Sequence, residues 1–283
     1  MVCYRPPHPA LSRKGERKKT RRSLPSFWRF AQPLILAQSS LLFPDKIKSE
    51  FTNRNRIFPH LKRLALKGIL ITFEGVEGSG KSAQIALLSD RLKRLGLQAL
   101  TTREPGGTSV GSAIRKIVLD PGTGALNPMT ELMLFASARA ELVGEVIRPA
   151  LDNGAVVLCD RFADSTTAYQ GYARGMNMKI IERVNRYSSS DIWPDRTIIL
   201  DLNPAVGLGR TMERMKTEGD SEARFENEGV EFHEKVRDGF LKIAEAEPDR
   251  VKVINADDTI DAIHEEVYKA VSDILSPPYR GGD

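Results

Sequence analysis

One short segment, residues 69–82, constrains the fold of this chain more than any other. An apolar run that contains β-branched side chains, residues 69–73, is followed by a segment that reads G-x-x-x-x-G-K-S. A strand, a loop of this spacing and a helix together form a phosphate-binding loop, whose backbone N–H groups and helix N-terminus attract a polyphosphate. We expect Lys81 on the terminal phosphates and the Ser82 hydroxyl on Mg²⁺. The loop consists of Gly75, Val76, Glu77, Gly78, Ser79, Gly80, Lys81 and Ser82.

The first 66 residues differ in charge from the rest of the chain. They hold 15 of the 42 Lys and Arg but only three of the 37 Asp and Glu. The whole-chain net charge of +5 therefore belongs to residues 1–66 and does not indicate a nucleic-acid partner for the remainder. The two cysteines, Cys3 and Cys159, form no disulfide framework or metal site, which fits a reducing compartment.

Residues 1–66 do not read as a folded domain. The basic run from Arg13 to Arg22 is followed by short, interrupted apolar stretches, none long enough to span a membrane. A transit peptide and a weak secretory signal are two interpretations. We favour a third, a disordered or spurious extension, because the segment offers no core and a start near Leu66 would leave the phosphate-binding loop intact. Residues 67–276 are then the functional domain, and residues 277–283 are a tail.

From Lys67 onward, strand patterns alternate with helix patterns. Helices are expected after the loop, at 109–119, at 129–152 with an interruption at Pro149, and at the C-terminal end. Such alternation predicts a parallel three-layer α/β domain with ligands at the carboxyl ends of its strands. The five predicted strands are residues 69–73, 97–101, 155–159, 197–202 and 251–254.

Polar side chains follow the predicted strands. Asp160 and Arg161 come directly after residues 155–159, so they could offer a carboxylate to Mg²⁺ and a guanidinium to a phosphate, or alternatively cap the next helix. Phe135 and Arg139 lie four positions apart on a predicted helix and could stack on a base and bond its carbonyl. Alone, this pair is more commonly a core aromatic beside a surface arginine. The same spacing pairs Ser165 with Tyr169 and Thr166 with Gln170.

Residues 210–226 are charged and poor in large apolar side chains. They include Arg210, Arg214 and Arg224. A solvated segment that carries arginines over a phosphate site has the composition of a closing lid. An exposed, charged helix end is the alternative.

Taken in order, six motifs between Lys67 and Leu275 resemble those of the thymidylate kinases, which phosphorylate dTMP to dTDP with ATP. The resemblance implies a P-loop NTPase three-layer fold of the nucleoside-monophosphate kinase type, Mg²⁺ as cofactor, a homodimer and a cytoplasmic enzyme. The motifs are F-E-G-V-E-G-S-G-K-S (73–82), T-R-E-P-G-G-T (102–108), L-F-A-S-A-R (134–139), D-R-F-A-D-S-T-T-A-Y-Q-G (160–171), P-D-R-T-I-I-L-D-L (194–202) and R-F-E (224–226).

The resemblance also implies roles for single residues. The acceptor site would be formed by Glu77, Arg103, Phe135, Arg139, Arg161, Ser165, Thr166, Tyr169 and Gln170. In it, Phe135 would stack on thymine, and Arg139 and Thr166 would bond the base edge. Arg161 would hold the dTMP phosphate, with Arg103 nearby. Glu77 would meet the sugar 3′-hydroxyl, and Tyr169 would crowd the 2′ position. On the donor side, Arg210 would lie against adenine, and Ser82 and Asp160 would serve the metal.

One position separates two kinds of family member. Some thymidylate kinases carry an arginine directly after the acidic loop residue, where this chain has Gly78. In members without it, the catalytic arginine comes from the lid. The catalytic set is therefore Lys81 and Arg161 together with Arg214 or Arg224, and the sequence does not choose between the last two. Phe162 also replaces a Tyr or His that is usual in the family.

Two other functions are considered. A kinase for a different nucleoside monophosphate would share the same motifs. A nucleic-acid-binding P-loop ATPase would explain residues 1–66, but residues 67–283 carry 27 basic against 34 acidic side chains. We therefore expect neither a nucleic-acid partner nor a membrane. A GTPase is not favoured because the sequence has no N-K-x-D motif.

Overall fold

The structure is a computed structural model that describes residues 68–218 and 224–275. The expectations for residues 1–66 and for the tail at 277–283 lie outside these ranges. Within the described ranges, no helix is both long enough and apolar enough to cross a membrane.

A five-stranded parallel sheet forms the centre of the domain, in the order β2-β3-β1-β4-β5. The predicted α/β fold and all five predicted strands are confirmed, with ends that differ by one or two residues. The central position of β1 places the phosphate-binding loop in the middle of the carboxyl edge. The strands are β1 (Ile69–Glu74), β2 (Ala99–Arg103), β3 (Val156–Asp160), β4 (Arg196–Asp201) and β5 (Val251–Asn255).

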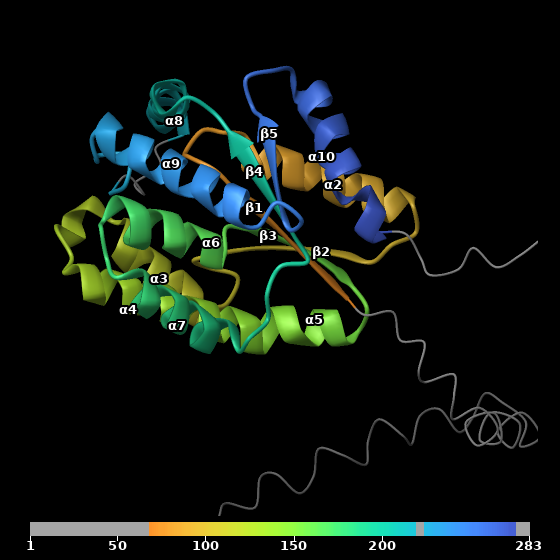
Figure 1. Ribbon diagram of the computed structural model, residues 1–283, viewed down its shortest axis with the longest axis horizontal. Helices are drawn as coiled ribbons and strands as arrows, with labels where there is room; N and C mark the ends of the chain where they lie inside the picture. Colours follow the sequence, from red (N-terminus) through yellow and green to blue (C-terminus); the bar gives the residue numbers. More distant parts are fainter. Residues whose placement is uncertain (1–67, 219–223, 276–283) are drawn as a thin grey trace, which may run out of the picture. The chain divides into compact units, whose positions relative to one another are not determined.

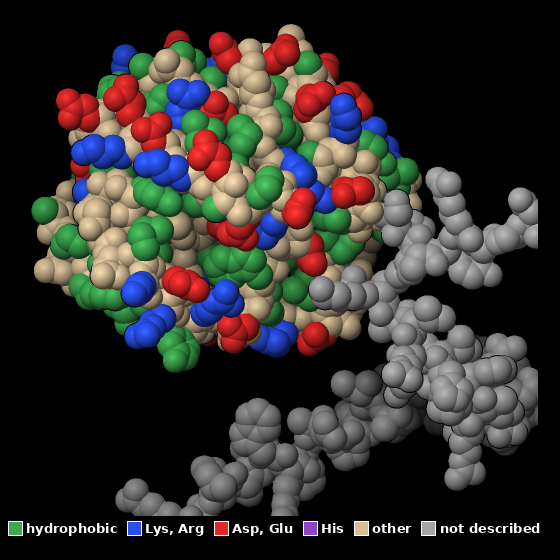
Figure 2. Space-filling model, in the orientation of Figure 1, with side chains coloured by type: hydrophobic (Ala, Val, Ile, Leu, Met, Phe, Trp, Pro, Cys, Tyr) green, Lys and Arg blue, Asp and Glu red, His purple; other side chains and the backbone are tan. Residues whose placement is uncertain are grey.

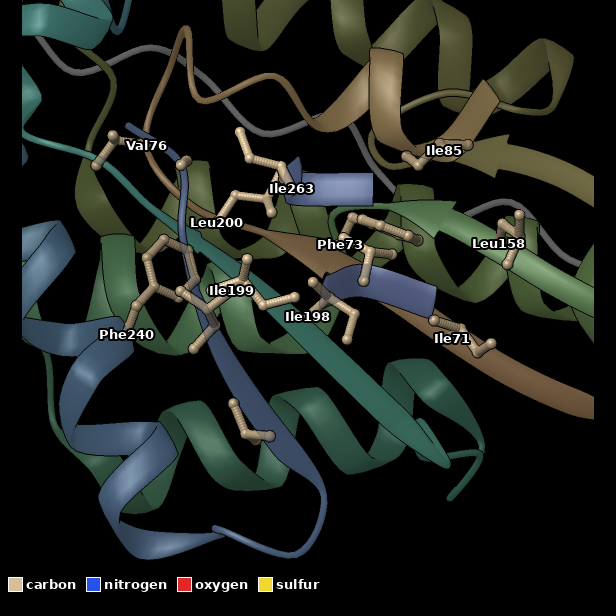
Figure 3. Close-up of a cluster of buried hydrophobic side chains, with 14 of the residues drawn as sticks. Ile71, Phe73, Val76, Ile85, Leu158, Ile198, Ile199, Leu200, Phe240 and Ile263 are labelled. Atoms are coloured by element: carbon tan, nitrogen blue, oxygen red, sulfur yellow. The ribbon is translucent and has the colours of Figure 1, made fainter. Parts of the chain in front are cut away.

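Apolar side chains cover both faces of the central strands, as expected for a buried parallel sheet. On β1, Ile71 and Phe73 belong to one core cluster, which also holds Leu158 and side chains of the flanking helices. Leu70, which points the opposite way, belongs to a second cluster with Val157. Figure 3 shows Ile71, Phe73 and Leu158 within the first cluster. The alternation on β1 therefore anchors the strand from both sides and holds the loop that follows it.

Helices cover both faces of the sheet. Figure 1 shows α2 and α10 on one face and α4, α5, α7 and α9 on the other. On the face seen in Figure 2, Lys and Arg side chains are interspersed with Asp and Glu. The α-helices are α2 (Lys81–Arg94), α3 (Ser109–Leu119), α4 (Pro128–Leu142), α5 (Arg148–Asp152), α6 (Ala163–Thr166), α7 (Met178–Ser189), α8 (Pro204–Glu218), α9 (Val230–Ala246) and α10 (Ile260–Leu275).

Two helical regions refine the sequence prediction. The predicted helix at 129–152 consists of α4, a π-helical turn η4 (Val143–Ile147) and α5, in which Pro149 lies in the first turn. A proline lacks the N–H of a regular helix and crowds the preceding turn, which explains the interruption. A second π-helical turn, η5 (Thr167–Ala173), follows α6. Helix α8 occupies much of the predicted lid, and a turn begins at Arg224. Helices α7 and α9 had not been assigned from the sequence.

Candidate active site

A cavity of about 510 Å³ opens at the carboxyl edge of the sheet. Its wall combines the phosphate-binding loop, the ends of β2 and β3, and side chains of α3, α4, α6, η5 and α8. Most of the predicted site residues therefore surround one space. Those that line it are Glu77, Gly78, Ser79, Gly80, Lys81, Ser82, Arg103, Phe135, Asp160, Arg161, Ser165, Thr166, Tyr169, Gln170 and Arg214.

The loop backbone has a conformation that requires glycine. Gly78 has φ 70°, and a Cβ added there would come within 2.2 Å of the Gly207 carbonyl oxygen on α8. An arginine at this position, as in the other kind of family member, would therefore collide with α8 as it stands. Gly75 has φ 133°, and its added Cβ would meet the Leu200 carbonyl oxygen at 2.4 Å. Both glycines are needed for the close approach of the loop to its neighbours.

Lys81 is folded back onto the loop. Its Nζ donates to the carbonyl oxygens of Gly75 and Val76 at 3.1 and 2.9 Å and to the Ser79 hydroxyl at 3.3 Å. Burial, together with the nearby charge of Arg161, lowers the pKa of Lys81 to about 8. A bound polyphosphate would favour the charged ammonium, because opposite charges stabilise one another in a buried site.

Ser82 and Asp160 lie side by side at the mouth of the loop. The Ser82 hydroxyl donates to Asp160 Oδ2 at 3.1 Å, and both residues line the cavity. This pairing follows from the sheet, because β1 and β3 are neighbours and Phe73 lies opposite Asp160. Two oxygen donors suit Mg²⁺, which binds one or two protein oxygens and completes its shell with phosphates and water. The residues present therefore fit the expected ion, although no cluster of three or more His, Cys, Asp or Glu occurs in the described part of the chain.

Arg161 points across the loop from the end of β3. Its guanidinium donates to the Gly75 carbonyl oxygen at 3.0 Å and to Glu77 Oε1 at 3.1 Å. The backbone that follows Arg161 is held by the buried carboxyl of Glu74, which accepts hydrogen bonds from the Phe162 N–H at 2.8 Å and from the Ser165 hydroxyl at 2.5 Å. Burial and the nearby Asp164 raise the pKa of Glu74 to about 8.

Glu77 gathers polar side chains from three elements. Its Oε1 accepts from the Tyr169 hydroxyl at 2.5 Å as well as from Arg161, and its Oε2 lies 3.0 Å from Nδ1 of His233 on α9. Burial raises the pKa of the Glu77 carboxyl, but the contact with His233 and the charge of Arg161 outweigh burial and hold the pKa below its ordinary range. His233 was missed in the sequence analysis, because a lone histidine on a helix carries no ligand spacing.

Arg139 lies behind the cavity wall rather than in it. It is fully buried, and its guanidinium donates to the Glu104 carboxylate at 2.6–3.0 Å, to Asn185 Oδ1 at 2.6 Å and to the Thr166 hydroxyl at 2.5 Å. Arg139 therefore does not line the cavity, and its direct contact with a base stays a prediction. Phe135, Thr166 and Gln170 are the parts of this wall that face the cavity.

The three arginines of the predicted lid have different surroundings. Arg214 on α8 is exposed and lines the cavity, and no hydrogen bond or ion pair of its guanidinium occurs among the described residues. Arg224 donates to Glu131 Oε2 at 2.6 Å and to the Val118 carbonyl oxygen at 2.5 Å, so it is attached to α3 and α4 outside the cavity. Arg210 is half-exposed, lies 3.8 Å from Asp257 and does not line the cavity.

Comparisons with known proteins agree on one family. The family model described as thymidylate kinase matches residues 73–267. A thymidylate kinase from Syntrophotalea carbinolica is 46% identical over 209 residues, covering 74% of this chain and 97% of that protein. One from Geobacter sulfurreducens is 48% identical over 209 residues, covering 74% and 96%. The chain belongs to the thymidylate kinase family.

A solved thymidylate kinase structure gives the same answer for the fold. The crystal structure of the enzyme from Ehrlichia chaffeensis superposes with a TM-score of 0.58 at 35% identity, covering 72% of this chain and 98% of that one. The resemblance based on the six motifs is thus confirmed. The chain is an ATP-dependent nucleoside-monophosphate kinase that phosphorylates dTMP on the way to dTTP. The comparisons do not favour the nucleic-acid-binding ATPase or a kinase for another nucleotide.

Within this thymidylate kinase cavity, seven further residues line the wall without having been predicted, among them Ala83, Glu104 and Pro105. Arg115 and Leu119 come from α3, and Phe225 and Glu226 are the last two residues of the predicted lid. The R-F-E motif at 224–226 contained the last two, but only its arginine was given a role. Arg115 carried no such signal, because a basic residue on the polar face of a helix is ordinarily a surface residue.

Proposed function

We propose that the chain transfers the γ-phosphoryl group of ATP to a phosphate oxygen of dTMP, with both nucleotides in the one 510 Å³ cavity. This proposal rests on one observation: the phosphate-binding loop and the side chains of Phe135, Thr166 and Gln170 line the same cavity. A phosphate acceptor is already anionic, so no strong general base is required. Catalysis then depends on positioning and on neutralising charge.

On the donor side, residues 75–82 would enclose the ATP phosphates with their backbone N–H groups. Lys81 would exchange its present carbonyl partners for phosphate oxygens. Ser82 and Asp160, 3.1 Å apart, are the residues that would hold Mg²⁺. When bound, the ion would neutralise negative charge on the phosphates.

On the acceptor side, Arg161 and Arg103 would hold the dTMP phosphate, and Phe135 would stack on thymine. Thr166 already accepts a hydrogen bond from Arg139, so its own O–H is free to donate to a carbonyl on the base edge. Arg139 would then act through Thr166 rather than by direct contact. Glu77 remains the proposed partner of the sugar 3′-hydroxyl, and Tyr169, which bonds Glu77, would crowd the 2′ position.

Among the lid arginines, Arg214 is the proposed catalytic one. It lines the cavity, and its guanidinium is not engaged by described residues. Arg224 is held by Glu131 at 2.6 Å with only 9% of its side chain exposed. Removing Arg224 from that pair would leave Glu131, which is 1% exposed, with Arg174 at 3.3 Å as its remaining cationic partner, which is costly. Arg214 is therefore the arginine that can reach a transferring phosphoryl group when the lid closes.

The test is a coupled assay with ATP, Mg²⁺ and dTMP. Lys81→Ala should abolish turnover while dTMP binding, measured by calorimetry, stays within a few-fold, since Lys81 belongs to the donor side. An active Lys81→Ala enzyme would show that the loop assignment is wrong. Rates with dCMP and dGMP should be lower than with dTMP, because a donor at Thr166 rejects bases that present donors there, whereas uracil in dUMP presents the same carbonyl oxygens as thymine.

The assembly and location of the enzyme stay predictions that rest on the resemblance: a homodimer in the cytoplasm. Helix α4 carries two exposed methionines, Met129 and Met133, at 43% and 50% exposure, and could provide a dimer contact. Sedimentation analysis of the full chain tests the dimer directly.

A further inference from the structure

His233 is fully buried between two oxygen atoms that can only accept hydrogen bonds. Its Nδ1 lies 3.0 Å from Oε2 of Glu77 in the phosphate-binding loop. Its Nε2 lies 3.0 Å from the carbonyl oxygen of Phe225, which directly follows Arg224. Neither Glu77 Oε2 nor His233 Nδ1 has a hydrogen-bond partner among the described residues, and their mutual contact is close but not aligned as a regular hydrogen bond, so we treat it as an ion pair.

The chemistry of imidazole limits how both contacts can be satisfied. A neutral imidazole carries one N–H, so one of the two oxygens would face a nitrogen lone pair at 3.0 Å. An imidazolium carries an N–H on both nitrogens, so it can donate to the Phe225 carbonyl oxygen and present a positive N–H to the Glu77 carboxylate. An unpaired buried polar group costs free energy, so the arrangement favours the doubly protonated ring.

The charged groups around His233 favour the same state. Glu77 faces the ring from the phosphate-binding loop and Glu226 from the end of the lid, while Arg161 lies beyond Glu77. Burial would lower the pKa of His233, but the contact with Glu77 and, less strongly, Glu226 outweigh burial and raise it above the ordinary value.

His233 also joins two parts that must act together. The backbone of Glu77 lies against α8 just before the lid, since a Cβ added at Gly207 would meet the Glu77 carbonyl oxygen at 2.2 Å. At the end of the lid, the His233 ring lies between the Glu77 side chain and the Phe225 carbonyl oxygen and contacts both. Glu77 therefore contacts α8 just before the lid directly, and the end of the lid by way of His233.

We propose that His233 is a positioning residue that, as an imidazolium, orients the Glu77 carboxylate toward the acceptor nucleotide and ties the return end of the lid to the phosphate-binding loop. The proposal rests on the role proposed above for Glu77. His233 touches no reacting atom, and its effect is transmitted through Glu77 and Phe225.

The charge state is tested by NMR titration of the imidazoles in the full-length chain, which has four histidines. His233 is assigned by the loss of its signals in His233→Gln. In the wild type, His233 should titrate above about 6.5, the ordinary value. In Glu77→Gln its pKa should fall, because the neighbouring negative charge is gone. A wild-type ring that titrates below that value, or that is unaffected by Glu77→Gln, would overturn the proposal even if no His233 variant folds.

Two variants separate the halves of the contact. His233→Asn places an amide near the Nδ1 position and can still donate to Glu77, whereas His233→Gln places one near Nε2 and can still donate to Phe225. We expect His233→Gln to raise KM for dTMP roughly tenfold to a hundredfold, the range for losing one buried contact to a charged group, with KM for ATP nearly constant. We expect His233→Asn to lower kcat more than it raises KM for dTMP, because the lid tie is lost.

The pH profile separates positioning from mere packing. As pH rises above the ordinary histidine value of about 6.5, KM for dTMP in the wild type should rise as His233 loses its proton, while in His233→Asn it should change little, since the amide does not titrate. Parallel profiles would contradict the proposal.

The matched control is His264→Asn, a buried histidine on α10 that does not line the cavity and should leave kcat and both KM values unchanged. A wild type without dTMP kinase activity would refute the proposed function, whereas an active wild type with unaffected variants would refute only the role of His233.

Discussion

Arg161 adopts a backbone conformation that few residues other than glycine adopt. Its φ of 66° lies in the left-handed region, which costs an L-residue about 1–2 kcal/mol. The buried Glu74 carboxyl offsets this cost by accepting from the Phe162 N–H directly after the turn and from the Ser165 hydroxyl. The turn aims the guanidinium back across the loop, where it bonds Gly75 and Glu77. A single buried carboxyl therefore supports the arginine proposed to hold the dTMP phosphate.

The protonation of Glu74 gives a pH-dependent prediction. Its pKa is raised from 4.5 to about 8 in the folded chain, so the stability it contributes is fully present below about pH 4.5 and is lost as pH rises through 8. Urea unfolding at pH 6 and pH 9 should show a larger loss of stability for the wild type than for Glu74→Gln, whose amide does not titrate. Equal losses in the two proteins would mean that Glu74 is ionised at both pH values.

Thr166 is the second residue on which recognition of the base depends. Because Arg139 occupies one of its lone pairs, its O–H points elsewhere, and the proposed acceptor is the thymine edge. Thr166→Val keeps the shape but removes the hydroxyl and should raise KM for dTMP by roughly tenfold or more. Thr166→Ser, which keeps the hydroxyl, is the control and should stay within a few-fold. A Val variant with wild-type KM would exclude this contact.

The lid is attached differently at its two ends. Just before its start, the backbone of Gly207 on α8 packs directly against the phosphate-binding loop. At its return, Arg224 is bound to Glu131, which also accepts from Gln170 and Arg174. Arg214 lies on the part between these anchors, and its guanidinium makes no hydrogen bond or ion pair with the described residues. One arginine therefore holds the lid in place and another is available for chemistry.

This difference predicts opposite phenotypes for two similar substitutions. Arg214→Ala should lower kcat by roughly a hundredfold or more, the range for one charge-stabilising donor, and leave the free energy of unfolding unchanged. Arg224→Ala should lower the free energy of unfolding by about 3 kcal/mol, because Glu131 loses a buried partner. Urea unfolding curves and kcat values measured on both variants show which arginine serves catalysis and which serves stability. If Arg224→Ala is fully stable but slow, the assignment of the two arginines must be exchanged.

For the molecule as a whole, the described cavity draws all its lining residues from between Glu77 and Glu226. The excess of basic side chains belongs to residues 1–66, outside this range. Nothing in the proposed chemistry requires those residues. If residues 1–66 are a non-catalytic extension, as predicted, the enzyme should work without them.

Removal of residues 1–66 should leave the reaction unchanged. A chain that begins at Lys67 after an added Met is expected to keep kcat and both KM values within about twofold of the full-length protein, measured in the same coupled assay. A loss of activity in the folded, shortened chain would show that the extension contributes to the site.

The fold and the location of the site could be predicted from residue patterns within single segments of the sequence. The run at 69–73, the glycines of the loop and the apolar strand before Asp160 each specify their own conformation, and parallel strands bring their carboxyl ends to one edge. Five predicted strands were confirmed for this reason. The family motifs also predicted the substrates, because the combination of residues that they contain is rare outside this family.

The orientation of individual charged side chains could not be predicted in the same way. Arg139, Arg214 and Arg224 are indistinguishable as letters, yet one is fully buried behind the wall, one lines the cavity and one is paired with a carboxylate 93 positions away. His233 likewise meets Glu77 only because α9 packs beside the loop. Local sequence determines which segments form strands, loops and helices, whereas the partner of a buried charge is determined by packing between segments that are distant in the chain.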